Sequence, residues 1–225
     1  QLDASSLSVE LALQLAEHGF SDDRLADALI GFASRIDTPP QRAARLFRAA
    51  RSAGSARAGV ALADALAASG DLTAAGRVAE DLLAAQDTAE RAAAVRVAAA
   101  AAAHDGALAQ AADLYRWLGP HPDPVVTVSG LLAGVAVGDA QLARSTQGPP
   151  TSAARAARCL TDGVLASLDQ PYLAAMSKLG QSLGAEPARM PIGVDGPTAV
   201  TALAAIHGGD PARARSVLAR ALRGD

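Results

Sequence analysis

Residues 61–84 read ALADALAASGDLTAAGRVAEDLLA, two apolar runs joined by a Gly-Asp turn at positions 70–71. Small or apolar residues follow the turn glycine after five, nine and twelve positions. The same pattern recurs, in whole or in part, after three later glycines, Gly106, Gly138 and Gly209. The four glycines are separated by 36, 32 and 71 residues, and the last interval is close to twice the others. A fixed period in the mid-thirties is typical of stacked helical hairpins.

The composition of the chain favours helix over strand along nearly its whole length. Of the 225 residues 50% are hydrophobic, and the formal net charge is −3, as in ordinary globular proteins. Ala, the best helix former, makes up roughly a quarter of the residues, whereas β-branched and aromatic residues are sparse. We therefore expect an all-α fold, a right-handed α-solenoid of about six hairpins that forms a single domain over residues 1–225. Since Ala supplies most contacts, the helices should pack closely.

Apolar periodicity predicts thirteen helices. They span residues 5–18, 22–35, 41–52, 56–69, 72–85, 89–104, 107–118, 125–137, 140–146, 152–168, 171–183, 198–207 and 211–222. The residues expected to cap helix N-termini are Asp71, Thr88, Thr151, Ser152 and Asp210.

The longest interruption of the helical pattern is the stretch 185–197, AEPARMPIGVDGP. Its prolines and glycines predict a long internal loop, and its apolar residues, Met190 and Ile192 among them, predict that the loop packs back over the helices. Because the sequence begins with Gln1 and not with Met, we expect it to be a fragment of a longer protein.

No catalytic signature is present in the sequence. It has no phosphate-binding loop, no dinucleotide-binding fingerprint and no nucleophile elbow, so we expect no enzyme, no catalytic residue and no cofactor. Three of the four histidines, His18, His104 and His207, precede a turn glycine at the end of a helix. A cation is favoured there by the helix dipole, which predicts turn residues and no metal site.

The sequence also predicts where the protein works. The apolar run from Ala92 to Ala103 contains Arg96 and consists largely of Ala, so it is too weakly apolar to span a membrane. No signal peptide is recognisable at the N-terminus. The single cysteine, Cys159, is interpreted as a small buried residue and fits a reducing compartment. We therefore expect a cytoplasmic protein without membrane contact.

A basic stripe runs along one predicted helix and beyond it. The stripe consists of Arg42, Arg45, Arg48, Arg51 and Arg57. The acidic overall balance and the lack of aromatic residues among these arginines argue against direct contact with nucleic acid. The stripe is either a contact surface for another domain or a solvated face.

The concave face of the predicted array is the candidate ligand-binding surface, because the first helix of each hairpin lines it. The repeat places Arg57 and Asp64 in one hairpin and Arg96 in the next, on an otherwise apolar wall. Tyr115 and Trp117 lie two positions apart, so one should be buried and the other available as an aromatic platform. Such a wall suits a small polar molecule. The alternative is that these residues only pack or face solvent.

Four stretches of the chain resemble tetratricopeptide-like helical repeats: RAARLFRAARSAG at 42–54, ALADALAASGDLTAAGRVAEDLLA at 61–84, HDGALAQAADLYRWLG at 104–119 and GGDPARARSVLARAL at 208–222. They look still more similar to the sensor superhelix of large actinobacterial regulators of the MalT and LuxR type, which are signal-transduction ATPases. The large aromatics expected in the first helix of each repeat are replaced by Ala, Gly or Val. The resemblance implies that the superhelix binds an inducer, often a small sugar, and relays it to an ATPase module and a DNA-binding helix-turn-helix.

Two hypotheses follow. Either the chain is the effector-binding domain of a bacterial transcriptional regulator, sensing a small molecule such as a sugar and contacting other domains of the same protein, or it is a tetratricopeptide-type scaffold that binds a peptide segment of a protein partner. A closed pocket capped by residues 185–197 would favour the first, and an open groove lined by Asn or Lys would favour the second. The chain is poor in both residue types, with a single Lys at position 178, which favours the small molecule.

Overall fold

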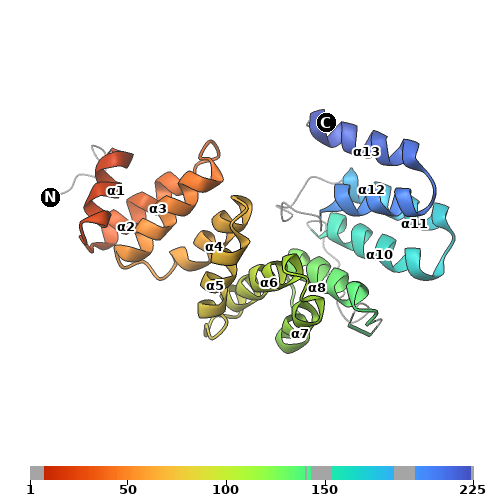
Figure 1. Cartoon of the computed structure of the whole chain (residues 1–225), viewed down its shortest axis with the longest axis horizontal. Coiled ribbons are helices and arrows are strands. Elements are labelled where there is room, and N and C mark those ends of the chain that lie inside the picture. The colour runs from red at the N-terminus through yellow and green to blue at the C-terminus, as the bar shows by residue number, and fades with distance from the viewer. Residues whose placement is uncertain (1–7, 140, 143–153, 185–195, 224–225) are drawn as a thin grey trace. The chain divides into compact units, whose positions relative to one another are not determined.

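The computed structural model of the protein describes residues 8–139, 141–142, 154–184 and 196–223 (Figure 1). This part of the chain contains twelve helices and no strand, which confirms the all-α prediction. The helices are α1 (Val9–Glu17), α2 (Asp23–Ala33), α3 (Pro40–Ser52), α4 (Ala58–Ala68), α5 (Leu72–Leu82), α6 (Thr88–His104), α7 (Leu108–Leu118), α8 (Pro124–Ala136), α10 (Arg155–Asp169), α11 (Tyr172–Leu183), α12 (Pro197–His207) and α13 (Pro211–Arg223).

Contacts divide the chain into two compact units, unit 1 (residues 1–114) and unit 2 (residues 115–225). The boundary falls within α7. Each unit is described by itself below. Within the described residues, no helix is both long enough and apolar enough to cross a membrane.

Twelve of the thirteen predicted helices are present, with ends that differ by a few residues. The remaining one, residues 140–146, falls almost entirely outside the described residues, as do the caps predicted at positions 151 and 152. The predicted loop at 185–197 also lies outside them as far as residue 195. Pro197, which was expected to end that loop, is already the first residue of α12.

The N-terminus of α6 corrects one predicted cap. Thr88 is the first helical residue, and the N-cap is Asp87. The Asp87 carboxylate accepts the backbone N–H groups of Ala89 and Glu90 at 2.8 and 2.9 Å. A charged carboxylate is favoured over a hydroxyl at the positive end of the helix dipole, which explains why the residue before Thr88 takes this role.

The four repeated glycines end their helices in the left-handed conformation. Gly70, Gly106, Gly138 and Gly209 have φ of 90°, 82°, 73° and 75°, a region in which a side chain is disfavoured. In every case the next residue donates its N–H to the carbonyl five positions back, as from Asp71 to Leu66 at 3.0 Å. This Schellman pattern satisfies carbonyls that the helix end would leave unpaired.

In three of these turns the residue after glycine is an aspartate that caps the next helix. Asp71 accepts the N–H of Ala74, and Asp210 accepts that of Arg213, both at 3.0 Å. A Gly-Asp pair therefore ends one helix and begins the next within two residues.

Asp139 makes the same kind of cap. Its carboxylate accepts the N–H of Leu142 at 2.9 Å and that of Gln141 at 3.0 Å, and it pairs with the Arg116 guanidinium at 2.8 Å. The Leu142 N–H and the Arg116 guanidinium hold the pKa of this carboxyl below its usual value.

The small residue five positions after a turn glycine packs inward. Ala75, Ala111 and Ala214 are 0%, 2% and 4% exposed. At the position nine residues after the glycine, α13 departs from this inward packing, since Leu218 is 44% exposed. The equivalent position after Gly138, Ala143, lies outside the described residues.

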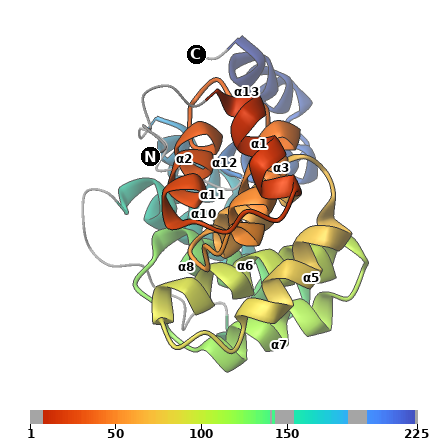
Figure 2. The same ribbon diagram turned by 90° about the vertical axis from the view of Figure 1, so that its left-hand side faces the viewer.

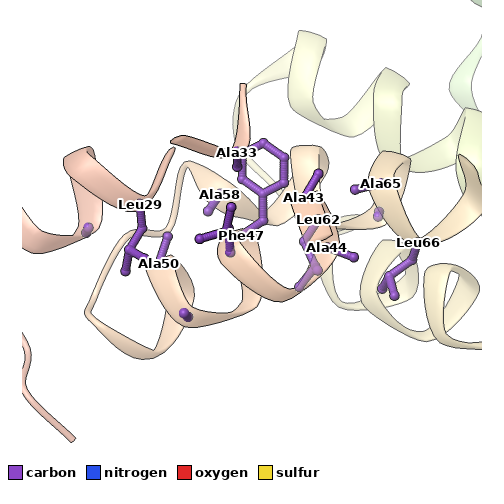
Figure 3. Packing of buried hydrophobic residues seen from close by; sticks show 14 of the residues in the cluster. Leu29, Ala33, Ala43, Ala44, Phe47, Ala50, Ala58, Leu62, Ala65 and Leu66 are labelled. Atoms are coloured by element: carbon purple, nitrogen blue, oxygen red, sulfur yellow. The ribbon is translucent and has the colours of Figure 1, made fainter. Parts of the chain in front are cut away.

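The core of unit 1 consists mainly of Ala and Leu side chains from α1 to α6. Figure 3 shows the Phe47 ring of α3 with alanines from neighbouring helices around it, and only 8% of Phe47 is exposed. A Cβ at Gly76 of α5 would lie 3.0 Å from the Cβ of Ala101 in α6. Such contacts require closely spaced helices and agree with the expected close packing.

Consecutive helices of unit 1 pack on one another from α2 to α6, and α1 contacts both α2 and α3 (Figures 1 and 2). α4 also contacts α6. This arrangement is compatible with stacked hairpins, and the right-handed solenoid stays a prediction.

Two arginines of α3 that belong to the predicted basic stripe form ion pairs with α1. Arg42 and Arg45 of α3 pair with Glu10 and Glu17 of α1 at 2.8 and 2.6 Å. Both pairs are exposed, so each contributes little to stability. Their effect is to neutralise half of the cationic ridge that the arginines of α3 would otherwise present.

The core of unit 2 is formed by residues of α8, α10, α11, α12 and α13. α10 and α11 approach each other closely at Gly163, where a Cβ would lie 2.7 Å from Cγ of Leu179. The Tyr172 ring lies against Gly208, where a Cβ would be 2.3 Å from the ring. The Tyr172 hydroxyl donates to the Asp210 carboxylate at 3.3 Å, and burial, followed by the charge of Asp210, raises the pKa of this tyrosine.

Candidate functional site

Two of the predicted wall residues meet in the structure. Asp64 of α4 and Arg96 of α6 form an ion pair across neighbouring helices. The Arg96 side chain is 19% exposed and that of Asp64 is 44% exposed, so the pair lies at the edge of the core. The sequence predicted these residues in adjacent hairpins on one wall, and the structure shows that α4 and α6 lie close enough for them to pair.

Arg57 does not join this pair. It is the residue before α4, and its guanidinium pairs with Asp27 of α2 at 3.1 Å while its side chain is 82% exposed. The three charged wall residues are therefore all paired within the chain. A ligand at this wall would have to break an existing ion pair or add to it.

The two aromatic candidates separate as their spacing predicts. Tyr115 is buried, with 5% of its surface exposed, whereas Trp117 is 57% exposed. Trp117 is thus the one available as an aromatic platform. It belongs to unit 2, while Arg57, Asp64 and Arg96 belong to unit 1. A common site for these residues stays a prediction.

The histidines end helices as predicted. The Nδ1–H of His18 donates to the Gln14 carbonyl at 2.7 Å, and the His18 backbone N–H donates to the same carbonyl at 3.0 Å, at the end of α1. His104 and His207 are the last residues of α6 and α12. Across the described ranges, no group of three or more His, Cys, Asp or Glu side chains is arranged to hold a metal ion.

A groove of about 350 Å³ lies in unit 1, bordered by α5, α6 and the first part of α7. We call it the α5–α7 groove. Its apolar lining includes Gly76 of α5 and Ala98, Ala101 and Ala102 of α6. The three alanines and Gly76 are buried, so they form a floor of very small side chains. These small side chains pack closely across α5 and α6, since a Cβ at Gly76 would lie 3.0 Å from the Cβ of Ala101, and together they form the apolar floor of the groove.

Polar side chains border the same groove. Arg77 and Glu80 come from α5, Asp105 caps the C-terminus of α6, and Gln110 comes from α7. All four are exposed. None of these side chains has an ion pair or hydrogen bond with another described residue. They differ in this respect from the three charged residues of the predicted wall.

Sequence reasoning missed these lining residues because Arg77 and Glu80 follow the polar face of an amphipathic helix, where solvated side chains are the rule. A signal was nevertheless present in the run of alanines at residues 98–103 together with Gly76. Small residues on two adjacent helices indicate a shallow surface between them.

Comparison with protein-family models, curated proteins and solved structures finds no match to the chain.

Proposed function

We propose that the chain is the effector-binding domain of a bacterial transcriptional regulator and that it holds a small polar molecule in the α5–α7 groove. The observation that carries this proposal is the combination of an Ala and Gly floor with four polar side chains that have no partner in the described protein. Small-molecule sites commonly combine a mostly apolar surface with a few polar groups. The groove volume of about 350 Å³ falls at the lower end of their usual range, about 300–1,000 Å³.

The regulatory context comes from the resemblance to MalT- and LuxR-type sensors. In this proposal the domain acts in the cytoplasm as a binding module and not as an enzyme. Binding would change its contacts with other domains of the same protein, which carry the ATPase and DNA-binding functions. The coding sequence on either side of the 225 residues tests this part, since it should contain a phosphate-binding loop or a helix-turn-helix.

The site itself moves from the wall predicted by sequence to the α5–α7 groove. Arg57, Asp64 and Arg96 are already paired, so a ligand gains less from them than from free side chains. Asp64 and Arg96 retain a proposed role in holding α4 against α6, next to the groove floor.

A scaffold that binds a peptide is the second candidate. It is favoured by the exposure of the polar side chains along α5 and α7, which leaves the groove open to an extended chain. Against it, no Asn or Lys lines the groove. These residues are the ones expected to bind a peptide backbone or its carboxylate at repeated positions.

Calorimetric titration against a panel of sugars, amino acids and other small polar metabolites tests binding. Gln110→Trp should fill the groove from its rim and abolish binding of any hit. Gln14→Trp, at an exposed position of α1, adds the same side chain outside the groove and should leave binding intact. A panel without a hit, or a hit that survives Gln110→Trp, would contradict the proposed site, and binding of peptides alone would support the scaffold.

A further inference from the structure

The charges that border the α5–α7 groove constrain what can fill it. Arg77, Glu80 and Asp105 supply one guanidinium and two carboxylates, a net charge of −1. No ion pair links Arg77 to Glu80 or to Asp105 in the described protein, and all three side chains are exposed to solvent water. A ligand that enters the groove displaces part of this water.

Displacing water from a charged group is costly unless the ligand replaces it with a complementary charge or a strong hydrogen bond. A neutral polyol offers only neutral hydroxyl groups to the guanidinium and the two carboxylates. An anionic ligand would gain from Arg77 but would face two carboxylates of the same sign. A ligand that carries both a cation and an anion satisfies the set best.

The spacing of Arg77 and Glu80 narrows the choice further. They lie three residues apart on α5, so their Cβ atoms are about 5–6 Å from each other on the same face of the helix. An α-amino acid carries its ammonium and carboxylate on one carbon atom, which suits two neighbouring side chains of opposite charge. The ammonium would meet Glu80 and the carboxylate would meet Arg77.

The apolar lining of the groove indicates the character of the ligand's side chain. Leu83 and Leu114 border the groove beside the Ala floor, close in sequence to Glu80 and Gln110. We infer that the α5–α7 groove binds a zwitterion, an α-amino acid with an apolar side chain, and not a neutral sugar. This inference rests on the proposed function, since it names the ligand class of the same site.

Titration of the full 225-residue chain with L-leucine, N-acetyl-L-leucine, L-leucinamide and maltose tests the ligand class. L-Leucine should bind with a stoichiometry of one to one. The acetylated compound lacks the ammonium and the amide lacks the carboxylate, so each should bind at least about tenfold more weakly, as expected for one lost charge-assisted hydrogen bond. Maltose should not bind.

Variants then assign the charges. Arg77→Gln should weaken L-leucine about tenfold or more and should remove the difference between L-leucine and L-leucinamide. Glu80→Gln should also weaken L-leucine, and it should remove the difference between L-leucine and N-acetyl-L-leucine. Arg48→Gln on α3, another exposed arginine but outside the groove, should leave every affinity unchanged. Circular dichroism of each variant shows whether the helices are intact.

The outcomes separate the two levels of the proposal. Suppose that maltose binds to the wild type but not to Gln110→Trp, and that L-leucine does not bind. The groove is then an effector site, but the zwitterion inference is wrong. If L-leucine binds equally well to wild type, Arg77→Gln and Glu80→Gln, the charge assignment is wrong. If neither compound binds, the zwitterion inference is overturned, and the larger metabolite panel decides whether the proposed function is overturned with it.

Discussion

The contact between Gly163 of α10 and Leu179 of α11 makes a sharp test of how closely these helices pack. A Cβ at Gly163 would lie 2.7 Å from both Cγ and Cδ2 of Leu179 and 3.0 Å from its backbone nitrogen. Carbon atoms in contact normally lie about 3.5–4.0 Å apart. Leu179 is 0% exposed, so its side chain has no open space to move into, and its backbone nitrogen cannot turn away.

Two opposing effects set the size of the change in Gly163→Ala. Replacing Gly by Ala inside a helix stabilises it by about 0.5–1 kcal/mol. Overpacking a well-filled core costs about 1–3 kcal/mol. Because one of the contacts is with backbone, we expect the second effect to dominate and the free energy of unfolding to fall by about 1–2 kcal/mol.

Gly180→Ala on α11 is the matched control. Gly180 is exposed, and a Cβ there would meet nothing within 4 Å. Only the helix-propensity gain applies, so this variant should be more stable than wild type by about 0.5–1 kcal/mol. Gly31→Ala on α2, where a Cβ also meets nothing within 4 Å, is the corresponding control in unit 1.

Urea unfolding followed by far-ultraviolet circular dichroism measures these differences. If the two units unfold in separate transitions, Gly163→Ala should lower only one midpoint, the one that Gly180→Ala raises. Equal stabilisation by Gly163→Ala and Gly180→Ala would refute the reasoning, because α10 and α11 would then have room for a methyl group at their contact.

Two further predictions concern polar contacts. A double-mutant cycle of Asp64→Asn and Arg96→Gln, measured by urea unfolding, should give a coupling free energy of about 0.5–1 kcal/mol that falls with added salt; no coupling at low salt would mean that the pair does not form in solution. Tyr172 should ionise above its ordinary pKa of 10.0, because burial and the charge of Asp210 disfavour the phenolate. The contribution of Tyr172 to folding stability is therefore present below the pKa of the unfolded state and is lost as the pH rises through the higher pKa of the folded state. A tyrosinate absorbance titration of wild type and Tyr172→Phe checks this.

The helices and turns of the described residues could be predicted from local sequence. Glycine is the residue that adopts positive φ without strain, so Gly70 and Gly209 mark helix ends whatever the tertiary packing around them. Aspartate directly after glycine is the cap that the next helix requires. The misplaced cap at Thr88 shows the limit of this reasoning, since Asp87 and Thr88 are both good caps and the carboxylate is the one that caps α6.

The candidate site could be predicted only in part. The repeat spacing placed Asp64 and Arg96 in adjacent hairpins on one wall, and in the structure the two side chains form an ion pair. The spacing could not show that they pair with each other, or that Arg57 pairs with Asp27. Both contacts depend on how helices that are not consecutive in the chain pack against one another. Trp117 and Tyr115 were known to point in different directions, but local sequence does not say which side of α7 is covered.

The sequence by itself determined the helical class, the places where helices end and the residues that cap them, because those properties depend on backbone conformation and hydrogen bonds within a few residues. Tertiary structure decided which small residues meet across helices and which charged side chains are left without partners. Gly76 and Ala101 come together only because α5 packs on α6, and the groove beside them exists for the same reason. A cavity is the space left between packed elements, and no single segment of the chain encodes it.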